Sequence, residues 1–340
     1  MRKNNILLSQ DLSVSEEYLK EILEELKKNF NKVYTLDNEL DNQNKNISYK
    51  IFRELTNKMS NKNFFKKLFF NYRLNLINGV LKKYKKVDYF FVIGNTEFSI
   101  YFLKNLKEIN PNIKFILFLW DKLEYSHWKS KTEYFDYIFS YDRVDAQKNN
   151  FMFRPTFFIN KCLENIPQEK EYALSYVGAL RDRKRYEYIK YLKEYLIKKG
   201  LKVFFKLYVD KNMKKNLPEN YDKDLIITKR ISYLENLEIL KKSKVVLDIK
   251  YKEQNGLTLR AYESLATGTK LITDNEDIRN YDFYDENNIK VIQMIEDIEK
   301  IPLDFFKTSV EKIDDKIKEK YTVKGFLNEI FETIERKKIK

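Results

Sequence analysis

Short runs rich in β-branched and aromatic residues alternate along this chain with longer charged stretches whose apolar residues recur at helical spacing, such as Glu16–Asn29 and Tyr186–Lys199. The runs YFFVIG and FILFLW are apolar throughout, which is typical of strands covered on both faces. Strands that alternate with helices indicate βαβ units and parallel sheets. The pattern predicts strands at Asn5–Ser9, Val33–Leu36, Val87–Ile93, Lys114–Leu119, Tyr137–Tyr141, Leu174–Gly178, Lys202–Leu207, Leu225–Thr228, Val245–Ile249, Lys270–Thr273 and Ile289–Ile292.

The alternation occurs twice, and the segment between the two series contains Pro155 and Pro167 and shows no clear period. We therefore expect an α/β fold of two doubly wound, Rossmann-like domains that face a central cleft, with ligands at the carboxyl ends of the strands. The charged C-terminal helical segment is expected to cross back and pack on the first domain. The predicted boundaries are 1–155 for the N-terminal domain, 156–171 for the linker, 172–307 for the second domain and 308–340 for the C-terminal segment.

Composition narrows the class of protein. The 340 residues include one cysteine and one histidine, so neither a disulfide framework nor a structural zinc site is expected. No apolar run approaches the ~20 residues that a transmembrane helix needs. The start, MRKNNILLSQDLS, lacks the long apolar stretch and the cleavage site of a secretory signal. These features predict a cytoplasmic protein.

The net charge of +14 is unevenly distributed, because residues 58–86 hold nine basic and no acidic side chains. The same stretch carries an apolar, partly aromatic stripe at helical spacing, which is typical of a helix that docks on an anionic membrane surface. A stripe that faces the protein core, with the lysines in solvent, is the first interpretation of this pattern, membrane contact is the second and nucleic-acid contact is the third. The residues predicted to contact a membrane are Lys62, Phe65, Lys66, Lys67, Phe69 and Arg73.

The first motif that carries chemistry is NGLTLRAYESLATGTKLIT, which follows the strand VVLDI. Asn255 and Gly256 form a turn signal, a helix is predicted over 257–266, and Gly268 is a suitable left-handed stop. The start of such a helix, which includes Thr258, offers unpaired N–H groups to a diphosphate. Arg260 adds a cation one turn in, and Glu263 suits the hydroxyls of a ribose. An ordinary βαβ crossover is the alternative.

The second motif, SYVGALRDRKR, opens the second domain. Its strand ends at Gly178, and four cations in five positions follow, as in a phosphate clamp: Arg181, Arg183, Lys184 and Arg185. A solvated basic loop is the alternative. Neither motif matches the glycine-rich dinucleotide fingerprint or a P-loop, which argues against NAD enzymes and ATPases.

The two motifs together resemble the donor half of bacterial GT-B glycosyltransferases, in particular the CgeB-like enzymes and similar enzymes of lipopolysaccharide or capsule biosynthesis. FLWDKLEYSHW and FDYIFSYDRVDAQKNNFMFRPTFF in the first half support the resemblance, which falls within residues 113–282. It implies a nucleotide-activated sugar on the second domain and an acceptor on the first. By the same resemblance, Arg181 or Lys184 would meet the diphosphate and Glu263 the ribose.

The chain departs from this family at two points. Many retaining relatives have a glutamate where this chain has Asn255, and the basic motif has a different spacing. Donor identity and stereochemistry therefore cannot be transferred. We interpret Asp222-Lys223-Asp224, just before a strand, as a surface turn and not as a metal site. The expectation is a metal-independent enzyme without a cofactor, in which protein cations and a helix terminus stabilise the leaving diphosphate.

An inverting transfer needs a base for the proton of the acceptor hydroxyl. Asp121 directly follows the run KFILFLW. An unperturbed histidine titrates near neutrality, and His127 is the one histidine of the chain. We therefore rank Asp121 first and His127 second as the base. A retaining enzyme needs no such base, and a lone histidine is often structural. Other residues predicted to line the acceptor side of the cleft are Asp11, Asn95 and Glu97.

The leading hypothesis is a glycosyltransferase that moves a sugar from a nucleotide-activated donor to a cell-surface polysaccharide or a lipid-linked glycan precursor. It would lie in the cytoplasm, peripherally on the inner face of the cytoplasmic membrane. The alternatives are a sugar-nucleotide epimerase or hydrolase on the same fold, or a basic nucleic-acid-binding protein. Nucleic acid is not expected as a partner, because no standard binding motif is present.

Overall fold

The computed structural model describes residues 4–10, 15–36, 84–94, 98–250 and 254–338. The chain forms two compact units. The first unit consists of Met1–Arg154 together with Ile330–Lys340, and the second unit consists of Pro155–Glu329. The expected linker 156–171 thus belongs to the second unit, as does the 308–329 part of the expected C-terminal segment.

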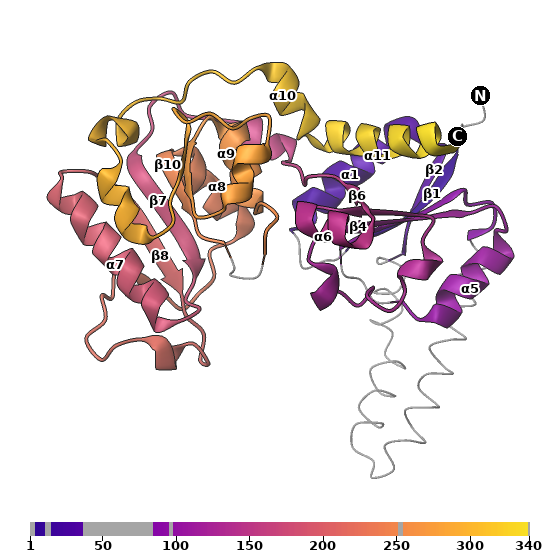
Figure 1. The fold of residues 1–340 in the computed structure, drawn as a ribbon, viewed down its shortest axis with the longest axis horizontal. Helices are drawn as coiled ribbons and strands as arrows, with labels where there is room; N and C mark the ends of the chain where they lie inside the picture. Colours follow the sequence, from indigo (N-terminus) through magenta and orange to yellow (C-terminus); the bar gives the residue numbers. More distant parts are fainter. Residues whose placement is uncertain (1–3, 11–14, 37–83, 95–97, 251–253, 339–340) are drawn as a thin grey trace, which may run out of the picture. The chain divides into compact units, whose positions relative to one another are not determined.

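The first unit is built on a six-stranded sheet in the order β2-β1-β3-β4-β5-β6, and every pairing in it is parallel (Figure 1). β3 and β4 occupy central positions, and almost all of their side chains are buried, as expected for the apolar runs YFFVI and KFILFL. The strands are β1 (Asn5–Gln10), β2 (Lys32–Thr35), β3 (Tyr89–Ile93), β4 (Lys114–Leu119), β5 (Tyr137–Ser140) and β6 (Met152–Phe153).

Helix α1 (Glu16–Asn29) shows how the sequence forms the helices of the first unit. Ser15 caps its start, Glu16 and Glu17 lie in its first turn, and Lys27 and Lys28 lie in its last turn, so the charges complement the helix dipole. Tyr18, Ile22 and Leu26 recur at helical spacing and are buried. The other helices of this part are α5 (Ile100–Ile109) and α6 (Arg143–Asn149), with short 3₁₀ helices at Leu123–Tyr125 and Thr132–Tyr134.

The second unit holds another parallel six-stranded sheet, in the order β12-β11-β10-β7-β8-β9. The chain starts in the middle of this sheet and builds outward in both directions, so β7 and β10 are the neighbours at which the order reverses. The strands are β7 (Tyr172–Ala179), β8 (Val203–Tyr208), β9 (Ile226–Ile227), β10 (Ser243–Asp248), β11 (Lys270–Thr273) and β12 (Ile289–Val291).

Helices α7 (Arg183–Lys198), α8 (Tyr233–Lys241) and α9 (Leu259–Thr267) connect these strands, and the short α10 (Asp315–Lys320) comes later in the unit. α9 ends at Gly268 in the left-handed region, with φ 59°, as predicted for a glycine stop. Seven of its nine residues are buried, so it is an interior helix.

The last helix, α11 (Val323–Lys338), runs from the second unit into the part of the chain assigned to the first. Within the first unit, Phe331 packs edge-on against Phe30, Tyr89 and Phe91, and the Tyr89 hydroxyl donates to Glu335 at 3.1 Å. No helix among the described residues is long and apolar enough to cross a lipid bilayer.

Candidate functional site

A network of polar contacts lies at the carboxyl edge of the second sheet, the edge where its parallel strands end. β7, β10 and β11 end there at Ala179, Asp248 and Thr273. β7 and β10 are also the strands at which the order reverses, and open α/β sheets bind ligands at such a switch point. The arrangement of the strands therefore selects this edge before any side chain is considered.

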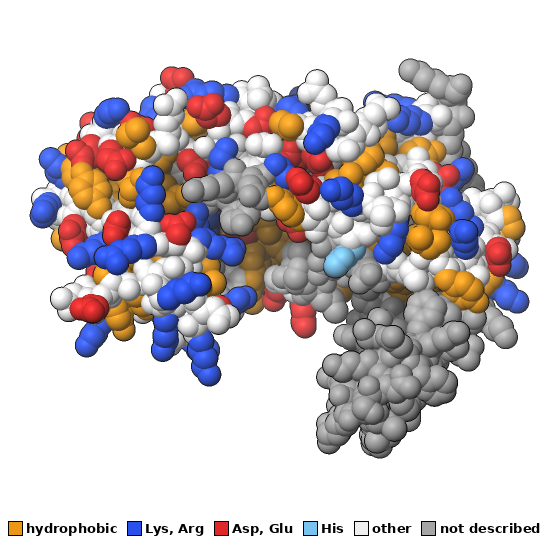
Figure 2. All heavy atoms as spheres, turned by 60° about the horizontal axis from the view of Figure 1, so that its bottom comes forward, with side chains coloured by type: hydrophobic (Ala, Val, Ile, Leu, Met, Phe, Trp, Pro, Cys, Tyr) orange, Lys and Arg blue, Asp and Glu red, His pale blue; other side chains and the backbone are white. Residues whose placement is uncertain are grey.

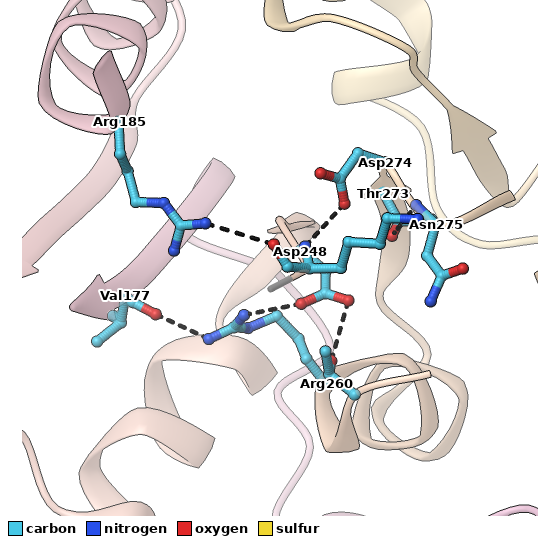
Figure 3. A network of polar contacts seen from close by, with 9 residues as sticks. Val177, Arg185, Asp248, Arg260, Thr273, Asp274 and Asn275 are labelled. Carbon is cyan, nitrogen blue, oxygen red and sulfur yellow. Dashed lines mark hydrogen bonds and ion pairs between the residues drawn. The ribbon is translucent and has the colours of Figure 1, made fainter. Parts of the chain in front are cut away.

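Arg260 of α9 joins the two switch-point strands, as Figure 3 shows. Its Nη1 contacts Asp248 Oδ1 of β10 at 3.0 Å, and its Nη2 donates to the carbonyl of Val177 in β7 at 2.7 Å. The side chain of Asp248 is only 2% exposed, whereas that of Arg260 is 20% exposed. The predicted cation one turn into the helix is therefore part of an ion pair, held at the edge in one orientation.

The start of α9 differs from the starts of the other described α-helices with an assigned N-cap. In α1, α5, α6, α7, α8 and α10 the N-cap side chain accepts a hydrogen bond from a first-turn N–H. The N-cap of α9 is Thr258, and its side chain makes no such bond. Its hydroxyl donates instead to Asp248 Oδ2 at 2.9 Å. The N–H of Ala261 donates to the carbonyl of Thr258 at 3.2 Å, and the Thr258 side chain caps none of the first-turn N–H groups of α9, which suits an anion.

The loop that leads into α9 is fixed by Asn275, which follows β11. The buried Asn275 side chain donates to the carbonyl of Asn255 at 2.9 Å and to that of Gly256 at 3.2 Å. The predicted turn residues Asn255 and Gly256 therefore contribute through their backbone, and the amide that positions them comes from another loop of the same edge.

Asp274 lies beside this network and accepts a hydrogen bond from the backbone N–H of Lys250 at 2.7 Å. Burial raises the pKa of Asp274, and the negative charge of Asp248 adds to the rise. Two carboxylates therefore occupy neighbouring strand ends, and only that of Asp248 is paired with an arginine.

Four cations lie between the end of β7 and the first turn of α7, each in a different setting. The exposed Arg183 pairs with Glu187 at 3.0 Å, and the Lys184 ammonium lies 5.1 Å from the centre of the Tyr188 ring. Arg185 is half-buried, and its Nη2 donates to the carbonyl of Lys250 at 3.4 Å (Figure 3). Arg181 is exposed, and its carbonyl accepts from Asn216 at 3.1 Å.

Arg185 is thus the predicted clamp cation that reaches the network around Asp248. Its position gives the signal that would have singled it out. Arg185 lies four residues before the buried Ile189, so it shares the inward-facing side of α7, whereas Arg183 and Lys184 lie outside that stripe.

Gly178, expected at the donor site, has a packing role in the structure. A Cβ at this position would come within 2.7 Å of Cζ of Tyr176, because the Tyr176 ring lies over the glycine. That ring also lies 5.9 Å from the Arg260 guanidinium. The glycine thus makes room for an aromatic side chain beside the ion pair.

Glu263, the predicted ribose acceptor, is only 4% exposed and lies on the buried part of α9. Its charge is felt by Cys162 in the 3₁₀ helix η4 (Asn160–Leu163), where burial first and Glu263 second raise the cysteine pKa to about 12. The structure therefore places Glu263 beside η4, and its contact with a ribose stays a prediction.

In the first unit, Asp121 is the second residue after the end of β4. His127 lies between the two 3₁₀ helices. Both side chains are exposed, and the single histidine is the pale-blue side chain in Figure 2. The next residue, Trp128, is buried and donates to the carbonyl of Gly94 at 3.1 Å, which anchors the segment. Their role as a base stays a prediction.

Several predicted residues lie outside the described residues: Asp11, Asn95, Glu97, Lys62, Phe65, Lys66, Lys67, Phe69 and Arg73. Within the described ranges, no group of three or more His, Cys, Asp or Glu side chains has an arrangement that would hold a metal ion. Asp222, interpreted above as part of a surface turn, pairs with Lys193 at 2.7 Å and accepts from the backbone of Asp224 at 2.9 Å.

The two sheets, with their connecting helices, define the GT-B fold of glycosyltransferases, which confirms the predicted fold class. Among solved structures, the apo form of the lipopolysaccharide outer core galactosyltransferase WaaB matches with a TM-score of 0.53 and 14% identity, over 97% of this chain and 99% of that chain. Trehalose-6-phosphate synthase OtsA matches with a TM-score of 0.56 and 10% identity, over 98% of this chain and 99% of that chain. No family model and no curated protein matches the sequence.

Proposed function

We propose that this protein is a metal-independent glycosyltransferase that transfers a sugar from a nucleoside diphosphate donor to a cell-surface polysaccharide or a lipid-linked glycan precursor. The GT-B fold supports glycosyl transfer in general. The observation that carries the proposal is the start of α9, where N–H groups without a side-chain acceptor lie beside an arginine fixed at the switch point of the sheet.

This arrangement suits the departure of a diphosphate. When the bond between the anomeric carbon and the diphosphate oxygen breaks, negative charge develops on the leaving group, and preorganised donors stabilise it. The N–H groups of α9, the guanidinium of Arg260 and the half-buried Arg185 lie at one edge of one sheet. The two bonds that Arg260 makes inside the protein leave further N–H groups of its guanidinium for a ligand.

The acceptor hydroxyl would attack the anomeric carbon and lose its proton to Asp121, or to His127 as the second choice. Asp121 follows a central strand of the first sheet and is exposed, as a base that meets a substrate must be. A membrane-bound acceptor would account for the basic, aromatic stretch 58–86, and we place the protein peripherally on the inner face of the cytoplasmic membrane.

The first experiment measures thermal unfolding with UDP, GDP, CDP and ADP, each with and without magnesium. We expect one nucleoside diphosphate to raise the Tm in the absence of magnesium. The corresponding labelled sugar nucleotide then distinguishes transfer to a glycan from hydrolysis or epimerisation. If no diphosphate raises the Tm and the protein binds nucleic acid with steep salt dependence, the proposal is wrong.

Glu263→Gln tests the ribose contact separately. A carboxylate that accepts two ribose hydroxyls contributes about 1–3 kcal/mol to nucleotide binding. We expect that loss in a calorimetric titration, with Glu332→Gln on the exposed face of α11 as the control. Unchanged affinity would remove Glu263 from the site and leave the diphosphate part of the proposal intact.

A further inference from the structure

Asp248 is the centre of the network at the carboxyl edge, and no motif in the sequence points to it. It is the last residue of β10, its side chain is 2% exposed, and both of its carboxylate oxygens are used. Oδ1 pairs with Arg260 at 3.0 Å, and Oδ2 accepts from the hydroxyl of Thr258 at 2.9 Å.

The contact with Arg260 fixes a flexible side chain. A free arginine samples many rotamers, and holding it in one of them has an entropic cost that must otherwise be met when a ligand binds. Asp248 and the carbonyl of Val177 grip the two terminal nitrogens from adjacent strands, so the guanidinium is oriented before any ligand arrives. Such preorganisation favours binding without adding a contact to the ligand.

The contact with Thr258 acts on the helix terminus. A threonine at an N-cap normally directs its oxygen to a first-turn N–H. Here the hydroxyl donates to Asp248 instead, and the N-cap side chain makes no bond to the first turn, although the N-cap carbonyl accepts from the N–H of Ala261 at 3.2 Å. One buried carboxylate therefore orients the arginine and also keeps the start of α9 open.

We propose that Asp248 is a positioning residue for the diphosphate: it holds the guanidinium of Arg260 and draws the Thr258 hydroxyl away, so that Arg260 and the first turn of α9 form one seat for the anion. The inference rests on the proposed function. It assigns to Asp248 a role through Arg260 and Thr258, without contact to the ligand itself, since like charges repel.

The competing interpretation is that Asp248 only stabilises the fold. The two interpretations differ in what a charge-removing variant does to different parts of the ligand. Loss of a positioning residue weakens binding of the diphosphate and leaves binding of the base and ribose unchanged. A general loss of structure weakens binding of every part of the nucleotide. The effect of a positioning residue also disappears once the residue that it positions is absent.

The experiment is a calorimetric titration of the full chain with UDP, GDP, CDP and ADP, followed by the diphosphate that binds best and its nucleoside. The proteins are the wild type, Asp248→Asn, Arg260→Met and the double variant. Asp222→Asn, in a surface turn of the same unit, is the matched control. Thermal unfolding shows which variants are folded.

We expect Asp248→Asn to weaken diphosphate binding about 10-fold or more, as for a lost charged hydrogen bond, and to change nucleoside binding less than about twofold. The double variant should bind the diphosphate more weakly than Arg260→Met by less than the loss in Asp248→Asn alone, because only the contact with Thr258 is left for Asp248 to act through. Three results would overturn the inference: wild-type diphosphate affinity in Asp248→Asn, equal losses for diphosphate and nucleoside, or additive losses in the double variant.

If Asp248→Asn does not fold, Thr258→Asn replaces it, because this variant keeps both charges and brings a side-chain oxygen that caps a helix start well. Closing the start of α9 in this way should weaken the diphosphate about threefold or more with the nucleoside unchanged, and an unchanged diphosphate affinity would overturn the inference. A wild type that binds none of the diphosphates would overturn the proposed function itself, before any variant is measured.

Discussion

Helices α7 and α9 both begin at the carboxyl edge of the second sheet. An aspartate contacts the start of each helix, but with opposite effects on the capping of its first turn. Asp182 is the N-cap of α7 and accepts from the N–H of Arg185 at 2.8 Å, so this terminus is closed. Asp248 lies at the end of a strand and takes the hydroxyl of Thr258, so the start of α9 stays open. The same residue type closes a helix or opens it, and its place in the strand or the loop makes the difference.

Breaking the Arg260–Asp248 pair from one side is expected to have the largest effect. Arg260→Met leaves a buried carboxylate without its cation, which costs about 3 kcal/mol of unfolding free energy. Urea unfolding of the variant and the wild type measures this loss. Arg260→Met/Asp248→Leu removes both charges and should recover most of the stability. If the single variant is as stable as the wild type, Asp248 is not a dehydrated charge.

A titrating side chain contacts the opposite end of α9. Lys170 donates to the carbonyl of Thr267 at 3.2 Å and to the hydroxyl of Thr269 at 2.8 Å, and burial lowers its pKa to about 8 from 10.5. Between these values the unfolded chain binds more protons than the folded one, so the free energy of unfolding should rise with pH, by about 2 kcal/mol after allowance for solvent screening.

Lys170→Met should lack this rise, and unfolding measured between pH 7 and 10.5 gives the comparison. The control is Lys202→Met, because Lys202 is exposed and its hydrogen bond with Glu171 raises its pKa. That variant should keep the rise. An unchanged pH profile in Lys170→Met would show that Lys170 is hydrated in solution.

Gly178→Ala tests the packing beside the ion pair. The new methyl group would press on the ring of Tyr176, with an expected loss of about 1–2 kcal/mol in unfolding free energy. Tyr176→Phe/Gly178→Ala removes the hydroxyl that lies nearest and should recover part of the loss. Full stability of the single alanine variant would show that the ring moves aside without cost.

The variant with the smallest expected effect, Asp182→Ala, tests the difference between the two helix starts. Asp182→Ala should cost about 1 kcal/mol, because α7 loses its N-cap, while nucleoside diphosphate affinity should stay within about twofold of the wild type. Chemical unfolding and calorimetry on the same preparation measure both quantities. A loss of affinity comparable with that of Asp248→Asn would contradict the distinction between a closed and an open terminus.

Most strands followed from the apolar pattern, because a parallel strand covered on both faces must be apolar along its whole length. The runs at Lys114–Leu119 and Lys270–Thr273 match the observed strands at both ends. The two-residue strand β6 (Met152–Phe153) was missed, since a run so short has no period, and only its pairing with β5 makes it a strand.

The candidate site was predicted less completely than the fold. The loop before α9 and the cation Arg260 were selected from a turn signal and a local spacing. Asp248 was not selected, and Arg185 was not distinguished from the other cations of its motif, because the importance of both comes from partners far away in the chain. The bond from Arg260 to Val177, for example, joins residues 83 positions apart.

The sequence by itself determined where strands and helices form, that the sheets are parallel, and which edge carries a helix start beside an arginine, because these properties depend on periodicity and on turn residues. Only the tertiary structure decided which charges are paired and which helix terminus is left open. Those properties depend on which strand ends lie side by side, and the order of strands in a sheet is set by packing over the whole unit.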